Sequence, residues 1–168
     1  MYHLKPRCTV KGCPNLTLLS LEASPVSNDL LKEVKELKNL SGLLLRDTGI
    51  SDSGLKEIKV LKNLTKLSLY STLNSGVTNF GLAEIKELDR LSYLSLAGTR
   101  VTDKGLSELK ELKSLAELDL DFTRVSDSGL EELRELKNLK KLWLQDTRTT
   151  GAGIKRLKEV LPNCQVHR

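Results

Sequence analysis

The sequence is poor in the residues on which most enzyme and metal chemistry depends. Its 168 residues include two histidines, three cysteines and one tryptophan, and aromatic residues make up only 4%. His3 and His167 stand at opposite ends of the chain, so we do not expect them to serve one shared nucleophile. Cys8, Cys13 and Cys164 are too few for a disulfide scaffold and are not spaced as zinc ligands. We therefore expect no enzyme active site, no cofactor and no metal site.

Long apolar segments are also lacking. No run approaches 18 apolar residues, and no apolar signal-peptide segment follows Met1. There is no P-loop, no G-x-G-x-x-G and no H-E-x-x-H motif. The net charge of +5 permits an acidic partner without requiring one. These features predict a cytoplasmic, monomeric protein that does not contact a membrane.

What the chain does contain is a repeat, mostly with a step of 24 residues. Its consensus is L-x-x-L-x-L-x-x-T-x-V-T/S-D-x-G-L-x-x-L-x-x-L, and its threonines include Thr99, Thr123 and Thr147. Five units start near Asn39, Asn63, Arg90, Ser114 and Asn138, and a degenerate unit covers residues 13–38. We expect residues 13–168 to form one repeat domain of about six units, with residues 1–12 as an N-terminal cap or a truncated repeat.

Each unit combines two periodicities. The residues around Leu94 and Leu96 alternate as in a strand, whereas Leu106, Leu109 and Leu112 recur every three residues, as on one face of a helix. Between them, residues 102–103 (Thr-Asp) predict an N-cap and an acidic first turn, and residue 105 (Gly) predicts a close approach of backbones. Stacked units would form an α/β solenoid with a parallel sheet on its concave side and helices on its convex side.

The pattern resembles the leucine-rich-repeat superfamily over nearly the whole chain. The T-x-V-T-D-x-G-L variant, as in residues 99–106, is similar to repeats of bacterial proteins and of F-box substrate receptors. The usual turn asparagine of the family is replaced by Thr48, Thr72, Thr99, Thr123 and Thr147, whose hydroxyls can still bond the loop backbone. The resemblance implies a horseshoe-shaped scaffold for protein recognition and not for catalysis.

The residues between the leucines of each strand are expected to face solvent on the concave side. Four of the six aromatic residues fall there, and exposed aromatic side chains on a rigid surface are common interface contacts. Alternatively, Tyr70 and Tyr93 would only cover neighbouring strands, and Phe122 would lie under the following loop. The residues predicted to bind a partner are Tyr70, Tyr93, Glu117, Asp119, Asp121 and Trp143.

The same positions carry a net negative charge. They hold three bases (Arg46, Lys66, Lys141) and six acids (Glu22, Asp47, Glu117, Asp119, Asp121, Asp146), a sum of −3. Such a surface repels phosphate backbones and attracts basic protein segments. We therefore predict a protein partner with a basic segment, and no nucleic acid on the concave face. The three acids of residues 117–121 are about 6.5–7 Å apart, too far to share one calcium ion.

An arginine follows the threonine in three successive units. These residues are Arg100, Arg124 and Arg148. One interpretation is local pairing with Asp103, Asp127 or Asp146. The other is an anion-binding rim for a phosphate or an acidic partner loop.

Two further features lead to specific expectations. Residues 70–82 contain three extra residues, and Leu73–Gly76 would protrude beside Tyr70, either for function or as tolerated drift. Cys13 and Cys164 occupy leucine positions of the repeat, so we expect both to be buried, whereas Cys8 has no such position.

Two other functions remain open beside concave-face binding. The chain could be the substrate-recognition part of an F-box-like ubiquitin-ligase adaptor or effector, which requires an F-box elsewhere. It could also be a structural spacer within a longer repeat array. A partner that binds the concave face distinguishes both binding roles from the spacer.

Overall fold

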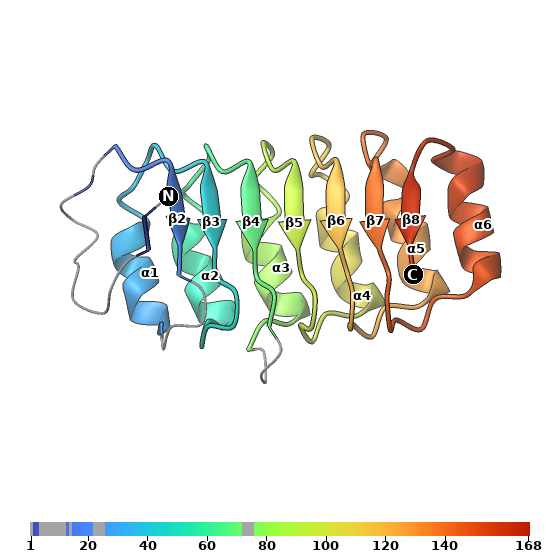
Figure 1. Ribbon diagram of the computed structural model, residues 1–168, viewed down its shortest axis with the longest axis horizontal. Coiled ribbons are helices and arrows are strands. Elements are labelled where there is room, and N and C mark those ends of the chain that lie inside the picture. Colours follow the sequence, from blue (N-terminus) through green and yellow to red (C-terminus); the bar gives the residue numbers. More distant parts are fainter. Residues whose placement is uncertain (1, 4–12, 14, 22–25, 72–75) are drawn as a thin grey trace.

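The computed structural model describes residues 2–3, 13, 15–21, 26–71 and 76–168. Within these ranges the strands stand side by side on one face of the molecule, and the helices stack behind them (Figure 1). Each turn of the coil adds one strand and one helix. The predictions for Cys8, Glu22, Ala23, Thr72 and the loop at 73–75, and most of the predicted cap at 1–12, lie outside the described residues.

The described strands form one parallel sheet of eight, in which each strand pairs with the next along the chain. The strands are β1 (Tyr2–His3), β2 (Leu18–Ser20), β3 (Gly42–Leu44), β4 (Lys66–Ser68), β5 (Tyr93–Ser95), β6 (Glu117–Asp119), β7 (Lys141–Trp143) and β8 (Gln165–His167). Leu67, Leu94, Leu118 and Leu142 are successive direct partners. The repeat therefore sets the strand register, and the predicted parallel solenoid is confirmed.

The helices are short because each must return the chain within one unit. They are α1 (Asn28–Val34), α2 (Asp52–Ile58), α3 (Asn79–Ile85), α4 (Asp103–Leu106), α5 (Asp127–Glu132) and α6 (Gly151–Val160). Two 3₁₀ turns, η2 (Ser107–Leu109) and η3 (Leu133–Glu135), continue α4 and α5. None of the described helices combines the length and apolarity needed to cross a membrane.

The leucines of the repeat form one continuous core between the two layers. Leu94, Leu118 and Leu142 in the strands are fully buried, as are Leu106 and Leu109 on the helix side. Full burial of a leucine side chain contributes about 1.5–3 kcal/mol. A single unit has no partner for these faces, so this contribution exists only when neighbouring units stack.

The two described cysteines behave differently. Cys164 is buried at a leucine position, as predicted, and it precedes β8. Cys13 is exposed, so the prediction that it is buried is wrong. Its carbonyl oxygen accepts a hydrogen bond from the Leu16 N–H (3.1 Å), which places Cys13 at the start of a turn and not in a packed layer.

The threonines of the turn satisfy carbonyl groups of their own unit. The hydroxyls of Thr48, Thr99, Thr123 and Thr147 each donate to the carbonyl oxygen three residues earlier, over 2.6–2.9 Å. This confirms the expectation for all four.

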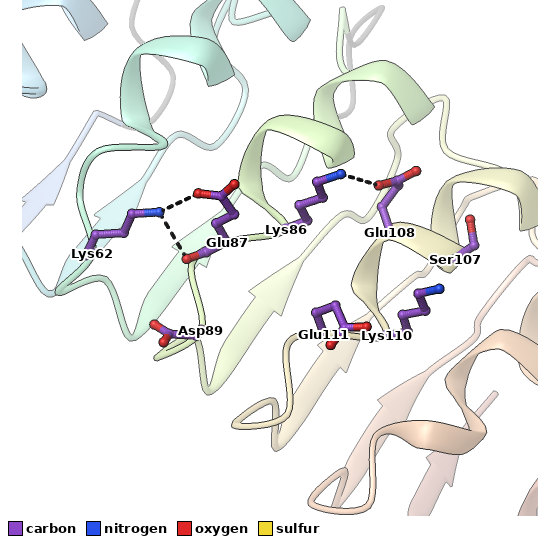
Figure 2. Close-up of a pocket in the computed structure, with 8 residues that line it drawn as sticks. All are labelled: Lys62, Lys86, Glu87, Asp89, Ser107, Glu108, Lys110 and Glu111. Atoms are coloured by element: carbon purple, nitrogen blue, oxygen red, sulfur yellow. Dashed lines mark hydrogen bonds and ion pairs between the residues drawn. The ribbon is translucent and has the colours of Figure 1, made fainter.

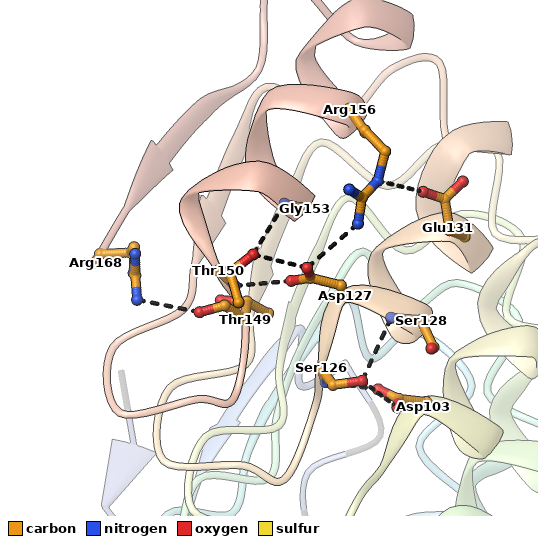
Figure 3. A network of polar contacts seen from close by, with 10 residues as sticks. All are labelled: Asp103, Ser126, Asp127, Ser128, Glu131, Thr149, Thr150, Gly153, Arg156 and Arg168. Carbon is orange, nitrogen blue, oxygen red and sulfur yellow. Dashed lines mark hydrogen bonds and ion pairs between the residues drawn. The ribbon is translucent and has the colours of Figure 1, made fainter.

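A second ladder of side chains connects neighbouring units, and it was not foreseen. Asp103 accepts hydrogen bonds from the N–H (2.7 Å) and the hydroxyl (2.6 Å) of Ser126, one unit further on (Figure 3). Asp127 does the same with Thr150, at 2.7 Å for both bonds. Asn79 replaces the carboxylate in its unit, because its Oδ1 accepts from the Thr102 N–H and its Nδ2 donates to the Thr102 hydroxyl. Thr102 is the N-cap residue of α4 and Asp103 lies in its first turn, as predicted, but the Thr102 side chain forms no capping hydrogen bond with this helix.

This ladder explains why a glycine recurs at the same position of successive units. A Cβ atom on Gly105 would collide with Asn79 Oδ1, and one on Gly153 would collide with the carboxylate of Asp127. The close approach predicted at Gly105 is therefore real, but the neighbour is a side chain and not a backbone.

These contacts predict that substitution by alanine destabilises the protein at one glycine of helix α6 but not at another. Gly153→Ala should destabilise the protein by about 1–3 kcal/mol, because the new methyl group displaces Asp127 from its bonds to Thr150. Gly151→Ala is the matched control, since nothing lies within 4 Å of its Cβ position. Urea unfolding of both variants measures the difference. Equal stability of the two would contradict the collision.

The ladder also predicts a pH dependence. The bonds from the Thr150 N–H and hydroxyl, together with Arg156, lower the pKa of Asp127 below its usual 3.8. A lowered pKa in the folded state adds stability above pH 3.8, and this stability is lost as the pH falls through the folded value. Asp127→Asn should keep the bonds, as Asn79 does, but lose less stability between pH 7 and pH 3. Unfolding curves at the two pH values test this, and identical losses in both proteins would refute it.

Candidate functional site

The candidate site is the open sheet face. We define it as the strand residues that point away from the helices, together with the two residues that follow the leucine after each strand. Strand pairing places Lys66, Tyr93, Glu117 and Lys141 in one row across β4 to β7. A second row contains Ser68, Ser95, Asp119 and Trp143. The residues predicted from the spacing thus lie on one surface.

Not all positions of this face are accessible, however. Ser20, Ser71, Ser95 and Ala97 were expected to face solvent, but they are at most 5% exposed. The side chains of these residues are short. The Ser95 hydroxyl, for example, donates to Asp119 Oδ2 at 2.9 Å. The accessible face is therefore formed mainly by the long side chains.

A hollow of about 380 Å³ crosses β3 to β6 on this face. It is lined by Leu44, Arg46, Lys66, Ser68, Tyr70, Tyr93, Ser95 and Asp119. Three of the predicted binding residues, Tyr70, Tyr93 and Asp119, thus meet in one depression. Among the other predicted residues, Glu117, Asp121 and Trp143 do not line it.

Two cations complete the hollow, and the sequence-based prediction did not include them. Arg46 Cζ lies 4.6 Å from the ring centroid of Tyr70, and Lys66 Nζ lies 4.8 Å from that of Tyr93. Such contacts hold a cation over an aromatic face. In both pairs the cation and the ring occupy the same position in successive units, which is the signal that could have identified them. Tyr70 and Tyr93 are half-buried, so the alternative that they cover neighbouring strands is partly correct.

The hollow also affects the Tyr93 hydroxyl. Burial raises the pKa of Tyr93, and the charge of Asp119 raises it further. The phenol therefore remains neutral at physiological pH and is available as a hydrogen-bond donor.

Carboxylates dominate the face beyond β5. Glu117 Oε1 is 2.9 Å from Lys141 Nζ, and Asp119 Oδ1 accepts from the Asp121 N–H at 3.1 Å. Asp121 Oδ1 in turn accepts from the Gln145 N–H at 2.6 Å. Burial, Asp119 and Asp146 raise the pKa of Asp121, against the opposing effect of the Gln145 N–H. Among the described residues, no group of three potential ligands is placed to hold a metal ion.

At the C-terminal end of the face, Trp143 stacks on His167, which was not among the residues predicted to bind a partner. The rings of Trp143 and His167 are 5.3 Å apart and inclined by 17°. His167 lies opposite Trp143 in the pairing of β7 with β8. Aligning the C-terminal Q-V-H with K-L-W would have placed it there.

Phe122 lies beside the acidic strand and is 49% exposed, so it is not covered by the following loop. Its φ is 58°, in the left-handed region. Asp47, Gly98 and Asp146 adopt the same conformation at the same repeat position. The conformation therefore belongs to the turn of the repeat and is not a special feature of Phe122.

The three arginines past the turn are exposed, and isolated bridges place Arg124 beside Thr102 and Arg148 beside Ser126. The predicted pairing with Asp103, Asp127 or Asp146 is wrong for Arg124 and Arg148, because no ion pair within the described ranges joins them to these acids. Asp103 and Asp127 bond the next unit instead. The anion-binding rim at Arg100, Arg124 and Arg148 stays a prediction.

A larger hollow, of about 740 Å³, lies between the C-terminal ends of successive helices (Figure 2). It is lined almost entirely by charged side chains, four of which pair across units: Lys62 with Glu87 (3.0 Å) and Lys86 with Glu108 (3.6 Å). It contains no aromatic residue. We interpret it as a solvated surface and place the candidate site on the open sheet face.

Similar solved structures support the fold. InlF, an internalin of Listeria monocytogenes, matches 99% of this chain with a TM-score of 0.52 and 16% identity. The L. monocytogenes internalin C2 matches 89% with a TM-score of 0.53, and a leucine-rich-repeat protein of Leptospira interrogans matches 91% with a TM-score of 0.60, each at 24% identity.

The extent of the likeness is limited in two ways. The chain spans 58% of the InlF structure, 79% of internalin C2 and 49% of the L. interrogans protein. No protein-family model matches the sequence, and no curated protein gives a significant match. The stacked strands, the buried leucine ladder and these structural likenesses nevertheless agree, and the protein has the leucine-rich-repeat fold.

Proposed function

We propose that the protein is a non-enzymatic interaction scaffold that binds a protein partner on the concave, open sheet face. The observation that carries this proposal is the gathering of Tyr70, Tyr93, Arg46 and Lys66 around one hollow in a sheet of fixed register. Aromatic and arginine side chains contribute most to binding energy at protein interfaces. Aromatic residues are scarce in this chain, yet four of the six belong to this face.

The rigidity of the face favours binding. Its residues stand on strands whose leucines are fully buried, so their backbone positions are fixed before a partner arrives. Ion contacts such as Lys141 with Glu117 restrict them further. Less conformational entropy is then lost on association, which increases affinity for a given contact area.

The stacked pair of Trp143 and His167 extends the proposed surface to the C-terminal end. The pair stands on β7 and β8, the two strands that follow the hollow, on the same side of the sheet. A partner that touches both the hollow and this pair would cover at least β4 to β7. Such a length is sufficient for an extended segment or one face of a helix.

This proposal predicts which aromatic residues a partner needs. Tyr93→Ala and Trp143→Ala should each weaken capture of a partner by about 30-fold, which corresponds to about 2 kcal/mol for a residue at the centre of an interface. Affinity purification from a cell extract, followed by mass spectrometry and titration with the identified partner, measures the effect.

Phe80→Ala is the matched control, because Phe80 is 82% exposed on helix α3 and does not belong to the open sheet face. Circular dichroism should show that all three variants remain folded. A partner that tolerates Tyr93→Ala and Trp143→Ala, or that is lost with Phe80→Ala, would exclude the open sheet face as the binding site. A folded chain that captures nothing would favour the role of structural spacer.

A further inference from the structure

The open sheet face changes its charge along the stack. Its cations Arg46 and Lys66 stand on the side of β3 and β4, around the hollow. Its described carboxylates beyond β5 are Glu117, Asp119, Asp121 and Asp146, with Lys141 bound to the first of them. The β5 unit between the two groups contributes the neutral residues Tyr93, Ser95 and Ala97. The sum of charges, from which a basic partner was predicted, hides this separation.

The two cations at the β3 and β4 end of the face are only weakly neutralised by nearby carboxylates. Lys66 forms no ion pair with any described residue, and its ammonium group rests on the ring of Tyr93. The ion contact of Arg46 with Asp47 is long (3.8 Å), and the Arg46 side chain is 55% exposed. Both cations therefore keep a partly free charge beside a depression large enough for a carboxylate side chain. Asp119, which also lines this depression, accepts hydrogen bonds from the Ser95 hydroxyl and the Asp121 N–H.

The carboxylates at the other end are available in a similar way. Asp146 is exposed and forms no ion pair within the described ranges. Asp121 bonds the Gln145 N–H through Oδ1, which leaves Oδ2 for another donor. The two acids follow β6 and β7, so they belong to adjacent units.

We propose that the open sheet face binds an extended protein segment that crosses the strands, with an acidic side chain in the hollow beside Arg46 and Lys66 and a basic side chain over Asp121 and Asp146. This inference rests on the proposed function and adds the chemistry of the partner. It replaces the basic segment predicted from the sequence by a segment that carries an acid and a base in a defined order.

The spacing of the two charges follows from strand geometry. Strands in a sheet are about 4.8 Å apart, so the three steps from β4 to β7 span about 14 Å. An extended segment rises about 3.3 Å per residue, and its side chains alternate between two sides. An acid and a base on the same side should then be four residues apart.

The test uses a random library of 12-residue peptides displayed on phage, selected on the full chain. The selected peptides should share an Asp or Glu four residues from a Lys or Arg. The double variant Arg46→Glu/Lys66→Glu should bind a peptide selected on the wild type at least tenfold more weakly, measured by fluorescence anisotropy. Selection on that variant should return peptides that are basic at both positions.

The matched control is Lys104→Glu/Lys155→Glu, which changes the net charge equally at two exposed helix residues without ion pairs among the described residues. Its affinity should stay within twofold of the wild type. Peptides that need Tyr93 and Trp143 but are uniformly basic, or carry no charge pattern, would overturn this inference and leave the proposed function intact. Selected peptides that are indifferent to Tyr93→Ala and Trp143→Ala would overturn the proposed function itself.

Discussion

The structure depends on the burial of leucine side chains between successive units. No unit can form alone, because the inward faces of its strand and its helix are covered only by its neighbours. Leu94, Leu118 and Leu142 illustrate this, since each is fully buried and each is the direct partner of the next. The same packing holds the outward side chains in rows, so the geometry of the open sheet face is a by-product of the core.

Polar side chains determine how closely the units approach on the helix side. Asp103 and Asp127 reach into the next unit and bond both its backbone and its hydroxyl group. The glycine beside each acid leaves the space for this contact. Leucine burial alone is non-directional, whereas these bonds require one relative placement of neighbouring units.

The sequence predicted the fold well because its signal is periodic. The leucine spacing indicated strands and helices, and the threonine spacing indicated hydroxyls that bond their own turn, as Thr99 and Thr123 do. Cys13 was misjudged because a leucine position in a degenerate unit does not guarantee a neighbour that covers it. Burial depends on the adjacent unit as well as on the position within the repeat.

The candidate site was predicted only in part, for a related reason. Tyr70, Tyr93 and Asp119 were identified, but Arg46, Lys66 and His167 were not, because their roles arise from contacts between units. The expected pairing of Arg124 and Arg148 failed because Asp103 and Asp127 bond the next unit. The pattern within one repeat predicts the direction in which a side chain points, whereas the side chains that it contacts lie 23 to 27 residues away, in neighbouring units.

The three extra residues after β4 leave the coil in register on both sides. Ser71 still donates its N–H to Ala97, and Gly76 still bridges to Ser51 before Thr78 bonds Asp52. The added length in the connection between Ser71 and Gly76 thus does not disturb the contacts of the units that flank it. This connection is a natural point for sequence exchange, where foreign loops could be grafted to alter recognition while the leucine ladder beneath remains unchanged.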